Sequence, residues 1–247
     1  MGSRVSADSQ HVRIPRKLWR KELLPLLVLA LVAGGAWAFA EIADEVIEGE
    51  THEVDERLLL ALRTPGDPAD PIGPEWIEEM ARDITALGGI AVLAMLTAGV
   101  AGYLALQGKP SAAVLVLLAV GSGCVVGTGL KHSFSRQRPD LVPHETQVYT
   151  SSFPSGHAMI AAVTYLTLGA LLMRIQSRRR VKAYLLALSI TLTLLVGASR
   201  VYLGVHWPTD VLAGWTAGAT WALIWWLIAW YLQRRGRVEP EEASPTD

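Results

Sequence analysis

The sequence predicts an all-α integral membrane protein, a bundle of six transmembrane helices. Apolar residues make up 51% of the 247 residues, and the mean hydropathy of +0.31 is high for a soluble enzyme. About 20 helical residues cross a hydrocarbon core of about 30 Å, and about 17 are the short limit. Six charge-free stretches have lengths near this range: residues 23–40, 84–106, 110–130, 158–173, 183–199 and 211–233.

A soluble bundle with buried helices is the alternative fold. Its helices would show charged faces that repeat every three or four residues, and the six stretches show no such faces. The fourth and fifth stretches are short, but the uncharged residues 151–156 and 201–207 extend them. We therefore predict six spans.

The chain begins with a basic tail, residues 1–20, which we expect to lie in the cytoplasm against anionic headgroups. The basic residues, the apolar run and the Ala-x-Ala pattern at residues 36–40 also describe a cleavable signal peptide. The apolar run of such a peptide is usually about 7 to 15 residues long, and the run over residues 23–40 is longer. We therefore predict an uncleaved anchor as the first span.

An acidic extracytoplasmic segment, residues 41–83, separates the first two spans. Up to Arg63 its apolar residues recur at mostly helical spacing, which favours an amphipathic helix on the membrane surface, with a solvated loop as the alternative. Prolines at positions 65, 68, 71 and 74 then predict an extended connector. The predicted membrane domain covers residues 21–235, and the Glu- and Pro-rich residues 236–247 are predicted to form a disordered cytoplasmic tail.

The distribution of charge predicts the orientation of the spans. Most of the 22 basic residues precede the first span, follow the sixth, or lie in the links after the second and fourth. The positive-inside rule makes this side cytoplasmic. We therefore expect a protein of the plasma (inner) membrane with both termini in the cytoplasm. The only cysteine, Cys124, lies within the third span, so no disulfide forms within one chain.

Three polar groups interrupt the apolar pattern, and the first follows the third span. Lys131 and Arg138 are seven residues apart, which is two turns on a continuing helix, so both cations would point the same way. Pro139 disfavours helix at the residue before it. Two such cations form an anion site, although basic residues at a span end are also common interfacial anchors.

The second group, Pro154-Ser155-Gly156-His157, directly precedes the fourth span. Ser155 is suited to cap the helix, Gly156 lets a ligand approach the backbone, and the N–H groups of a helix start attract phosphate oxygens. On its own, this pattern is more often only a helix start beside an uninvolved histidine.

The third group, residues 199–210, joins the fifth and sixth spans. It places Arg200, His206 and Asp210 at the membrane surface, where an unpaired charge is costly and usually functional. Asp210 follows His206 by four residues, close enough to hold one ring nitrogen while the other stays available as a nucleophile. The alternating spans put all three groups on the extracytoplasmic face, where we expect them to meet.

These residues carry a resemblance to a known family. The motifs K-x6-R-P, P-S-G-H and S-R-x5-H-x3-D occur in this order over residues 131–210, with every fixed position present. In this the chain resembles the type 2 phosphatidic acid phosphatase (PAP2) superfamily, which shares its phosphate pocket with vanadium haloperoxidases. The resemblance implies six spans around a haloperoxidase-like phosphatase core, and hydrolysis of a phosphomonoester or diphosphate on a lipid.

The resemblance also implies a role for each site residue. His206 attacks phosphorus to form a phosphohistidine, Asp210 fixes its tautomer, and His157 protonates the departing lipid oxygen. The phosphoryl oxygens are held by three cations and two helix-start residues: Lys131, Arg138, Arg200, Ser155 and Gly156. Because the cations replace Mg²⁺ in this scheme, and no acidic cluster with metal spacing lies near the motifs, we expect no metal and no other cofactor.

Several alternatives stay open at this point. The implied substrates are undecaprenyl diphosphate, phosphatidic acid and phosphatidylglycerol phosphate, and family resemblance does not choose among them. A phosphotransferase would pass the phosphoryl group to a lipid or sugar hydroxyl, and a non-catalytic transporter or scaffold would only retain the fold. The spans disfavour a haloperoxidase. The expected partners are the bilayer and its lipid phosphates and no nucleic acid, and the oligomeric state is not predicted.

Overall fold

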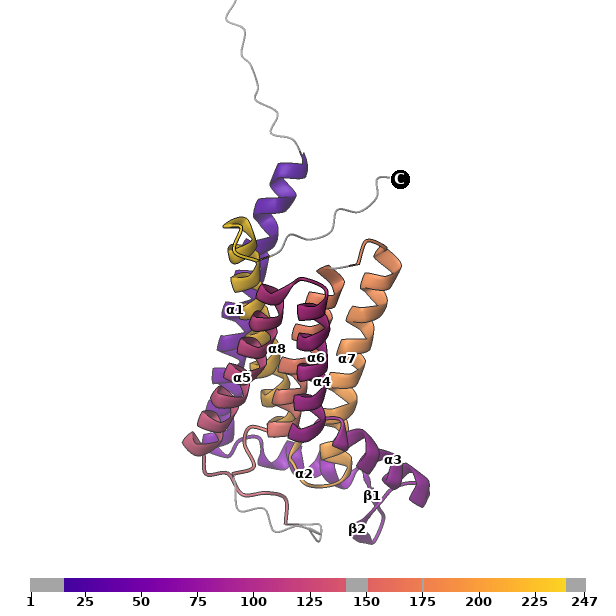
Figure 1. Ribbon diagram of the computed structural model, residues 1–247. Coiled ribbons are helices and arrows are strands. Elements are labelled where there is room, and N and C mark those ends of the chain that lie inside the picture. Colours follow the sequence, from indigo (N-terminus) through magenta and orange to yellow (C-terminus); the bar gives the residue numbers. More distant parts are fainter. Residues whose placement is uncertain (1–15, 141–150, 175, 239–247) are drawn as a thin grey trace, which may run out of the picture.

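A computed structural model describes residues 16–140, 151–174 and 176–238, with only the backbone for residues 16–22 and 174. These residues form eight helices and a two-stranded hairpin (Figure 1). Of the predicted tails, residues 1–15 and 239–247 lie outside the described residues. Both predicted boundaries are wrong, because the first helix already begins at Arg16 and Val238 of the predicted disordered tail is buried against the bundle. The elements are α1 (Arg16–Glu48), α2 (His52–Leu60), β1 (Arg63–Thr64), β2 (Asp67–Pro71), α3 (Glu75–Ala86), α4 (Ile90–Leu106), α5 (Pro110–Ser133), α6 (Gly156–Arg174), α7 (Arg179–Tyr202) and α8 (Pro208–Arg234).

The long helices run alongside one another, while α2, α3 and the hairpin gather at one end, which we call the hairpin end (Figure 1). Helix α6 is the central element, because it packs against α4, α5, α7 and α8. Its apolar window is also the most buried, at 61%, whereas that of α1 is only 6% buried. Helix α1 lies on the outside of the bundle, against α8.

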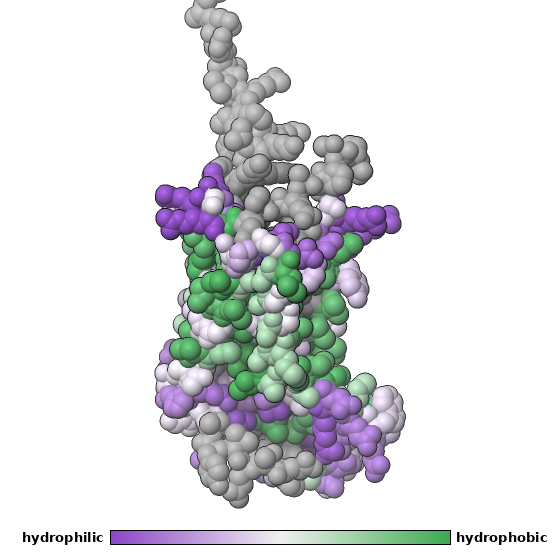
Figure 2. All heavy atoms as spheres, viewed as in Figure 1, coloured by the Kyte–Doolittle hydropathy of each residue, from purple (hydrophilic) through white to green (hydrophobic). Residues whose placement is uncertain are grey.

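On the face that Figure 2 shows, a broad apolar band covers the bundle between hydrophilic residues at both ends. In the part of the chain that the structure describes, five helices are long and apolar enough to span a membrane, namely α1, α5, α6, α7 and α8. The bent pair α3 and α4 passes the same test when taken together, so the bundle has six spans if this pair counts as one broken span. The predicted all-α transmembrane bundle is confirmed.

The second predicted span is not one helix. We expected continuous helix over residues 84–106, but α3 and α4 meet at an angle of 50°, with a break at residues 87–89. A Cβ on Gly88 would lie 2.4 Å from a methyl group of Val196, so only glycine fits where the break passes α7. The carbonyl of Leu87 at the end of α3 accepts a hydrogen bond from the Tyr165 hydroxyl at 2.8 Å. The break is therefore supported by tertiary contacts.

The acidic segment is mostly helical, so the solvated-loop alternative is wrong. Helix α1 continues to Glu48, and after a turn α2 begins at His52. The proline-rich residues are extended, as predicted, but they form an antiparallel hairpin in which Arg63 pairs with Pro71. Gly66, with φ of 91°, allows the tight turn between the strands. The hairpin is a small departure from the all-α prediction.

Helix α8 approaches α6 at glycine positions. A Cβ on Gly218 would lie 2.5 Å from the carbonyl oxygen of Met159, and one on Gly214 would lie 2.7 Å from that of Ser155. Small residues let helix backbones approach closely in membranes, where packing drives association. This contact brings the beginnings of α6 and α8 together at the hairpin end.

We expect Gly218→Ala to destabilise the bundle, because the added methyl group would force α8 away from α6. Overpacking of this kind costs about 1 to 3 kcal/mol, measurable as a lower thermal unfolding midpoint in detergent. The matched control is Gly121→Ala on α5, where a Cβ meets nothing within 4 Å. Equal midpoints for the two variants would contradict the close α6–α8 contact.

Candidate active site

The two cations of the first motif come from different local structures. Helix α5 ends at Ser133 and Phe134 is extended, with φ of −123°, so the expected continuing helix between Lys131 and Arg138 is wrong. The Phe134 ring packs edge-on against Phe153 with centroids 4.8 Å apart, which holds the chain away from the helix axis. Arg138 nevertheless reaches the site from this extended segment.

His206 lies at the centre of the site, and its side chain is buried. One ring nitrogen, Nδ1, lies 3.3 Å from Asp210 Oδ2, and the other, Nε2, lies 3.2 Å from Arg138 Nη1. Because a guanidinium only donates hydrogen bonds, Nε2 is the acceptor, and the imidazole hydrogen lies on Nδ1 toward the carboxylate. The predicted pairing of His206 with Asp210 is present, and Pro208 stands in the first turn of α8.

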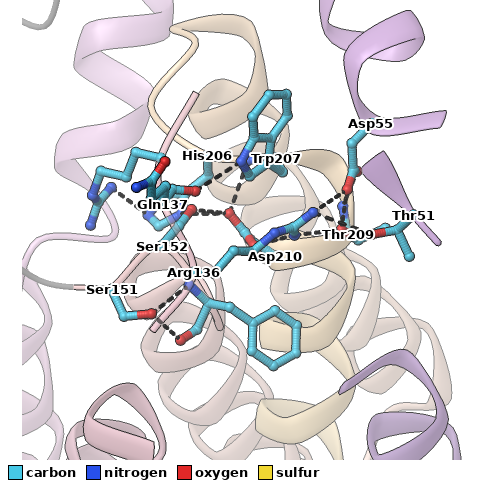
Figure 3. A network of polar contacts seen from close by, with 12 residues as sticks. Thr51, Asp55, Arg136, Gln137, Ser151, Ser152, His206, Trp207, Thr209 and Asp210 are labelled. Atoms are coloured by element: carbon cyan, nitrogen blue, oxygen red, sulfur yellow. Dashed lines mark hydrogen bonds and ion pairs between the residues drawn. The ribbon is translucent and has the colours of Figure 1, made fainter. Parts of the chain in front are cut away.

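Asp210 is held by several donors besides His206 (Figure 3). Its Oδ2 accepts hydrogen bonds from the backbone N–H of Trp207, at 3.0 Å, and from the Ser152 hydroxyl. Its backbone carbonyl accepts a bond from Ser155 N at 2.9 Å, which links the beginnings of α6 and α8. The carboxylate is therefore fixed relative to the helix-start motif.

Ser155 occupies the position before α6, where its carbonyl accepts the first helical bond from Met159 N at 3.0 Å. The expected side-chain cap is not formed. Its Oγ is buried and has no hydrogen-bond partner among the residues that the structure describes. Beside it, a Cβ on Gly156 would lie only 3.6 Å from Lys131 Nζ, so the glycine leaves room for the ammonium group.

Arg200 completes the set of cations from the last turn of α7. Its Nη1 donates to Thr85 Oγ1 at 3.2 Å, and its buried Nε has no partner within the described ranges. The charges of Arg138 and Arg200 act on the Lys131 ammonium, and all three cations act on His157. The structure therefore brings all eight predicted site residues to the hairpin end.

This arrangement is suited to an anion with several oxygen atoms. Three like charges repel one another, and the only carboxylate whose charge acts on both Lys131 and Arg138 is Asp210, within the part of the chain described. The buried Ser155 Oγ and Arg200 Nε also need partners, since buried polar groups are normally hydrogen-bonded. A phosphoryl group would supply both the negative charge and the acceptors.

Burial also determines the protonation of His206. Removal from water, together with the charges of Arg138 and Arg200, lowers the pKa of His206 to about 3, against the opposing effect of Asp210. Burial likewise lowers the pKa of Arg138, which Asp210 counteracts. The His206 imidazole is therefore neutral at neutral pH and has a lone pair on Nε2.

Sequence reasoning missed residues that surround Asp210. Arg136 Nη1 lies 2.6 Å from Asp210 Oδ1, and Arg136 Nη2 lies 2.6 Å from Asp55 Oδ2 on helix α2 (Figure 3). Ser152 and Thr209 also join this network. In the sequence, Arg136 is one more cation beside Lys131 and Arg138, and Asp55 is one of many acidic residues. No spacing rule connects positions 55, 136 and 210.

Comparisons with known proteins agree with the geometry. The model of the PAP2 superfamily matches residues 112–234. Phosphatidylglycerophosphatase B of Bacillus subtilis is 36% identical over 148 residues, which are 58% of this chain and 70% of the relative. An undecaprenyl-diphosphatase of Sulfolobus acidocaldarius is 43% identical over 68 residues, covering 28% of this chain and 29% of the relative.

Solved structures show the same fold. The crystal structure of a transmembrane PAP2 type phosphatidylglycerolphosphate phosphatase from Bacillus subtilis matches with a TM-score of 0.68 and 27% identity, over 84% of this chain and 98% of that one. LpxE of Aquifex aeolicus shares the fold with a TM-score of 0.50 and 24% identity, over 70% of this chain and 93% of its own. With its motifs, bundle and relatives in agreement, the chain belongs to the PAP2 superfamily, as the sequence predicted, and is a membrane phosphatase of that superfamily.

Proposed function

We propose that this protein is an integral membrane lipid phosphatase that hydrolyses a phosphomonoester or diphosphate through a phosphohistidine on His206, at the extracytoplasmic face. The observation that carries the proposal is the neutral His206 ring, with Nδ1 turned to Asp210 and Nε2 turned toward the cluster of cations. A nucleophile held beside an anion site is the arrangement that covalent phosphoryl transfer requires.

The proposed reaction has two steps. In the first, His157 is protonated while the bound phosphate balances the three cations. His206 Nε2 attacks phosphorus, the bond from phosphorus to the lipid oxygen breaks, and His157 gives its proton to that oxygen. Asp210 balances the positive charge that forms on the imidazole. In the second step, His157 takes a proton from a water molecule, the water attacks phosphorus, and the bond to nitrogen breaks to release phosphate.

The basic cluster supplies the electrostatic stabilisation. Lys131, Arg138 and Arg200 face the phosphoryl oxygens, and the Ser155 hydroxyl and the Gly156 N–H at the start of α6 add donors. Because these donors are already in place before the reaction, little reorganisation is needed as charge moves to the oxygens. The proposal needs neither a metal ion nor another cofactor.

A lipid phosphate fits the position of the site. Lys131 is in the last turn of α5 and His157 in the first turn of α6, so both lie where membrane-spanning helices end. A headgroup phosphate would reach the cations there while its tail stayed in the bilayer. Undecaprenyl diphosphate, phosphatidic acid and phosphatidylglycerol phosphate are the proposed substrates, and the relatives named for two of these lipids support the choice.

Charge supports the proposed orientation. The end of the bundle opposite the site carries a group of basic residues: Lys109, Arg178, Arg179, Arg180, Lys182, Arg234, Arg235 and Arg237. By the positive-inside rule this end faces the cytoplasm, so the hairpin end faces outward. Residues 1–20 and 236–247 would then be cytoplasmic tails of a plasma (inner) membrane protein.

Replacing His206 with alanine should abolish phosphate release from detergent-solubilised protein supplied with each proposed lipid in turn. The physical reason is the loss of the only proposed nucleophile. Rapid acid-free quenching with a ³²P-labelled substrate should trap label on the parent protein and none on His206→Ala. Substantial phosphate release by the variant would refute the phosphohistidine.

Two further measurements on the same preparation separate the alternatives. Vanadate, which imitates the transferring phosphoryl group, should inhibit the parent, whereas EDTA should not. Free phosphate in proportion to the lipid consumed indicates hydrolysis. A phosphorylated lipid or sugar acceptor would instead indicate a phosphotransferase, and no turnover of any lipid phosphate would favour a transporter or scaffold.

Stability should depend on pH through His206. Its folded-state pKa is lowered to about 3, so between this pH and about 6.5 the unfolded chain binds a proton that the folded chain does not. The stability that the neutral His206 contributes is therefore fully present above the unfolded pKa, and it is lost as the pH falls toward the folded-state pKa. From pH 7 to pH 5 the parent should lose about 2 kcal/mol that His206→Asn does not lose, measured from unfolding midpoints.

The control for this measurement is His132→Asn, which changes an exposed histidine at the end of α5. It should keep the pH dependence of the parent. If His206→Asn also keeps that dependence, His206 is not held neutral by burial.

The orientation can be tested by labelling with a membrane-impermeant maleimide on intact cells. In a Cys124→Ser background, Ala69→Cys in the exposed hairpin should be labelled directly, because it lies at the end proposed to be extracytoplasmic. Gln107→Cys, exposed at the opposite end, should be labelled only after permeabilisation. The reverse pattern would place the active site in the cytoplasm.

A further inference from the structure

A chain of buried charges runs from the proposed nucleophile to helix α2 (Figure 3). The side chains of Asp210 and Asp55 are fully buried, and that of Arg136 between them is 13% exposed. Each terminal nitrogen of Arg136 holds one carboxylate, at 2.6 Å in both cases. The guanidinium therefore connects the aspartate behind His206 with an aspartate outside the three motifs.

Neighbouring threonines fix the orientation of the guanidinium. Thr209 Oγ1 donates to Asp55 Oδ2 at 2.6 Å and accepts from Arg136 Nη1 at 2.8 Å. Its backbone N–H donates to Asp55 Oδ1 at 2.9 Å. Thr51 Oγ1 accepts from Arg136 Nη2 at 3.2 Å. A planar group with several donors is needed to make all these bonds, and lysine could not replace it.

The two oxygens of Asp210 have separate partners. Oδ2 faces His206 Nδ1 and the Trp207 N–H, whereas Oδ1 faces Arg136. Without Arg136, Oδ1 loses its donor among the described residues, and the carboxylate is held through Oδ2 alone. The Arg136 contact therefore acts on the ring of His206 through Asp210.

Burial of these charges needs an explanation other than stability. Desolvation of a buried ion pair offsets most of its Coulomb attraction, and a well-packed apolar set is often equally stable. Helix α2 also carries an exposed pair, Arg57 with Glu53, whose side chains are 71% and 84% exposed. Such exposed pairs contribute little. The buried pair of Arg136 and Asp55 differs from this exposed pair because Arg136 also contacts Asp210, the aspartate proposed to orient the nucleophile.

We propose that Arg136 and Asp55 are positioning residues for the phosphoryl-transfer step. Arg136 fixes the Asp210 carboxylate, Asp55 fixes Arg136, and the docking of α2 on the start of α8 thereby sets the orientation of His206. The two carboxylates and one guanidinium leave a net negative charge behind the imidazole, which favours the positive phosphohistidine. This inference rests on the proposed function of His206.

Arg136→Gln and Asp55→Asn test the proposal in the full-length protein, with phosphate release from a lipid substrate of the parent as the readout. Each should lower kcat by up to about 100-fold, the cost of a misplaced catalytic group, while KM changes little because the phosphate-binding cations are untouched. Arg136→Lys should recover only part of kcat, since it restores the charge but not the two-pronged geometry. The matched control is Glu53→Gln on α2, which should leave kcat unchanged.

A double-mutant cycle separates positioning from a general structural effect. In an Asp210→Asn background the link to His206 is already broken, so Arg136→Gln should lower kcat further by less than about threefold. A full and equal loss in both backgrounds would overturn the proposal. If Arg136→Gln does not fold, the same cycle with Asp55→Asn decides, because this variant keeps the shape of the side chain.

The outcomes also distinguish this inference from the proposed function. A parent protein that releases no phosphate from any lipid, or that keeps its activity in His206→Ala, defeats the phosphohistidine itself. An active parent that needs His206, together with Arg136→Gln and Asp55→Asn variants at parental kcat, defeats only the positioning role.

Discussion

The mutual repulsion of Lys131, Arg138 and Arg200 is the constraint on which the rest of the structure depends. Like charges gathered at the edge of an apolar band destabilise a fold unless rigid elements hold them and an anion balances them. Here the three cations come from the end of α5, the extended chain after it, and the end of α7. Each belongs to a different element, so the packing of the bundle keeps them together.

The close contact between α6 and α8 is what places this cluster beside the proposed nucleophile. Gly214 and Gly218 allow the backbone of α8 to lie against α6, which places the start of one helix beside the start of the other. Ser155 N then bonds the carbonyl of Asp210 directly. The start of α6, whose N–H groups are proposed to bind the anion, and the His206–Asp210 pair are thus connected through a single backbone bond.

The sequence was sufficient to predict the membrane helices and to predict that the three motifs lie at the same end of the bundle. Hydropathy identified the membrane helices, since the bilayer imposes length and composition on each one separately. Alternation of the spans then placed Lys131, His157 and His206 at the same end without any knowledge of packing. The first prediction uses the local composition of each segment. The second needs only the number of membrane crossings between one motif and the next.

The features that sequence reasoning missed are tertiary. Residues 84–106 read as one apolar helix, but the break at residues 87–89 depends on Val196 and Tyr165, which are distant in sequence. The end of α5 at Ser133 depends on the packing of Phe134 against Phe153. Asp55 and Arg136 are surrounded in the sequence by other charged residues, and only their common burial beside Asp210 distinguishes them.

This division between motif and surrounding structure also bears on the choice of substrate. The motif residues are proposed to contact what the proposed substrates have in common, a phosphoryl group. Relatives named for phosphatidylglycerophosphate and for undecaprenyl diphosphate both match this chain, so a shared match does not encode the lipid. The remainder of the lipid would then meet residues outside the motifs, and at the hairpin end α2, α3 and the hairpin supply such residues. If Asp55 couples α2 to Arg136 and Asp210 as proposed, a change in α2 also acts on the orientation of the proposed nucleophile, His206.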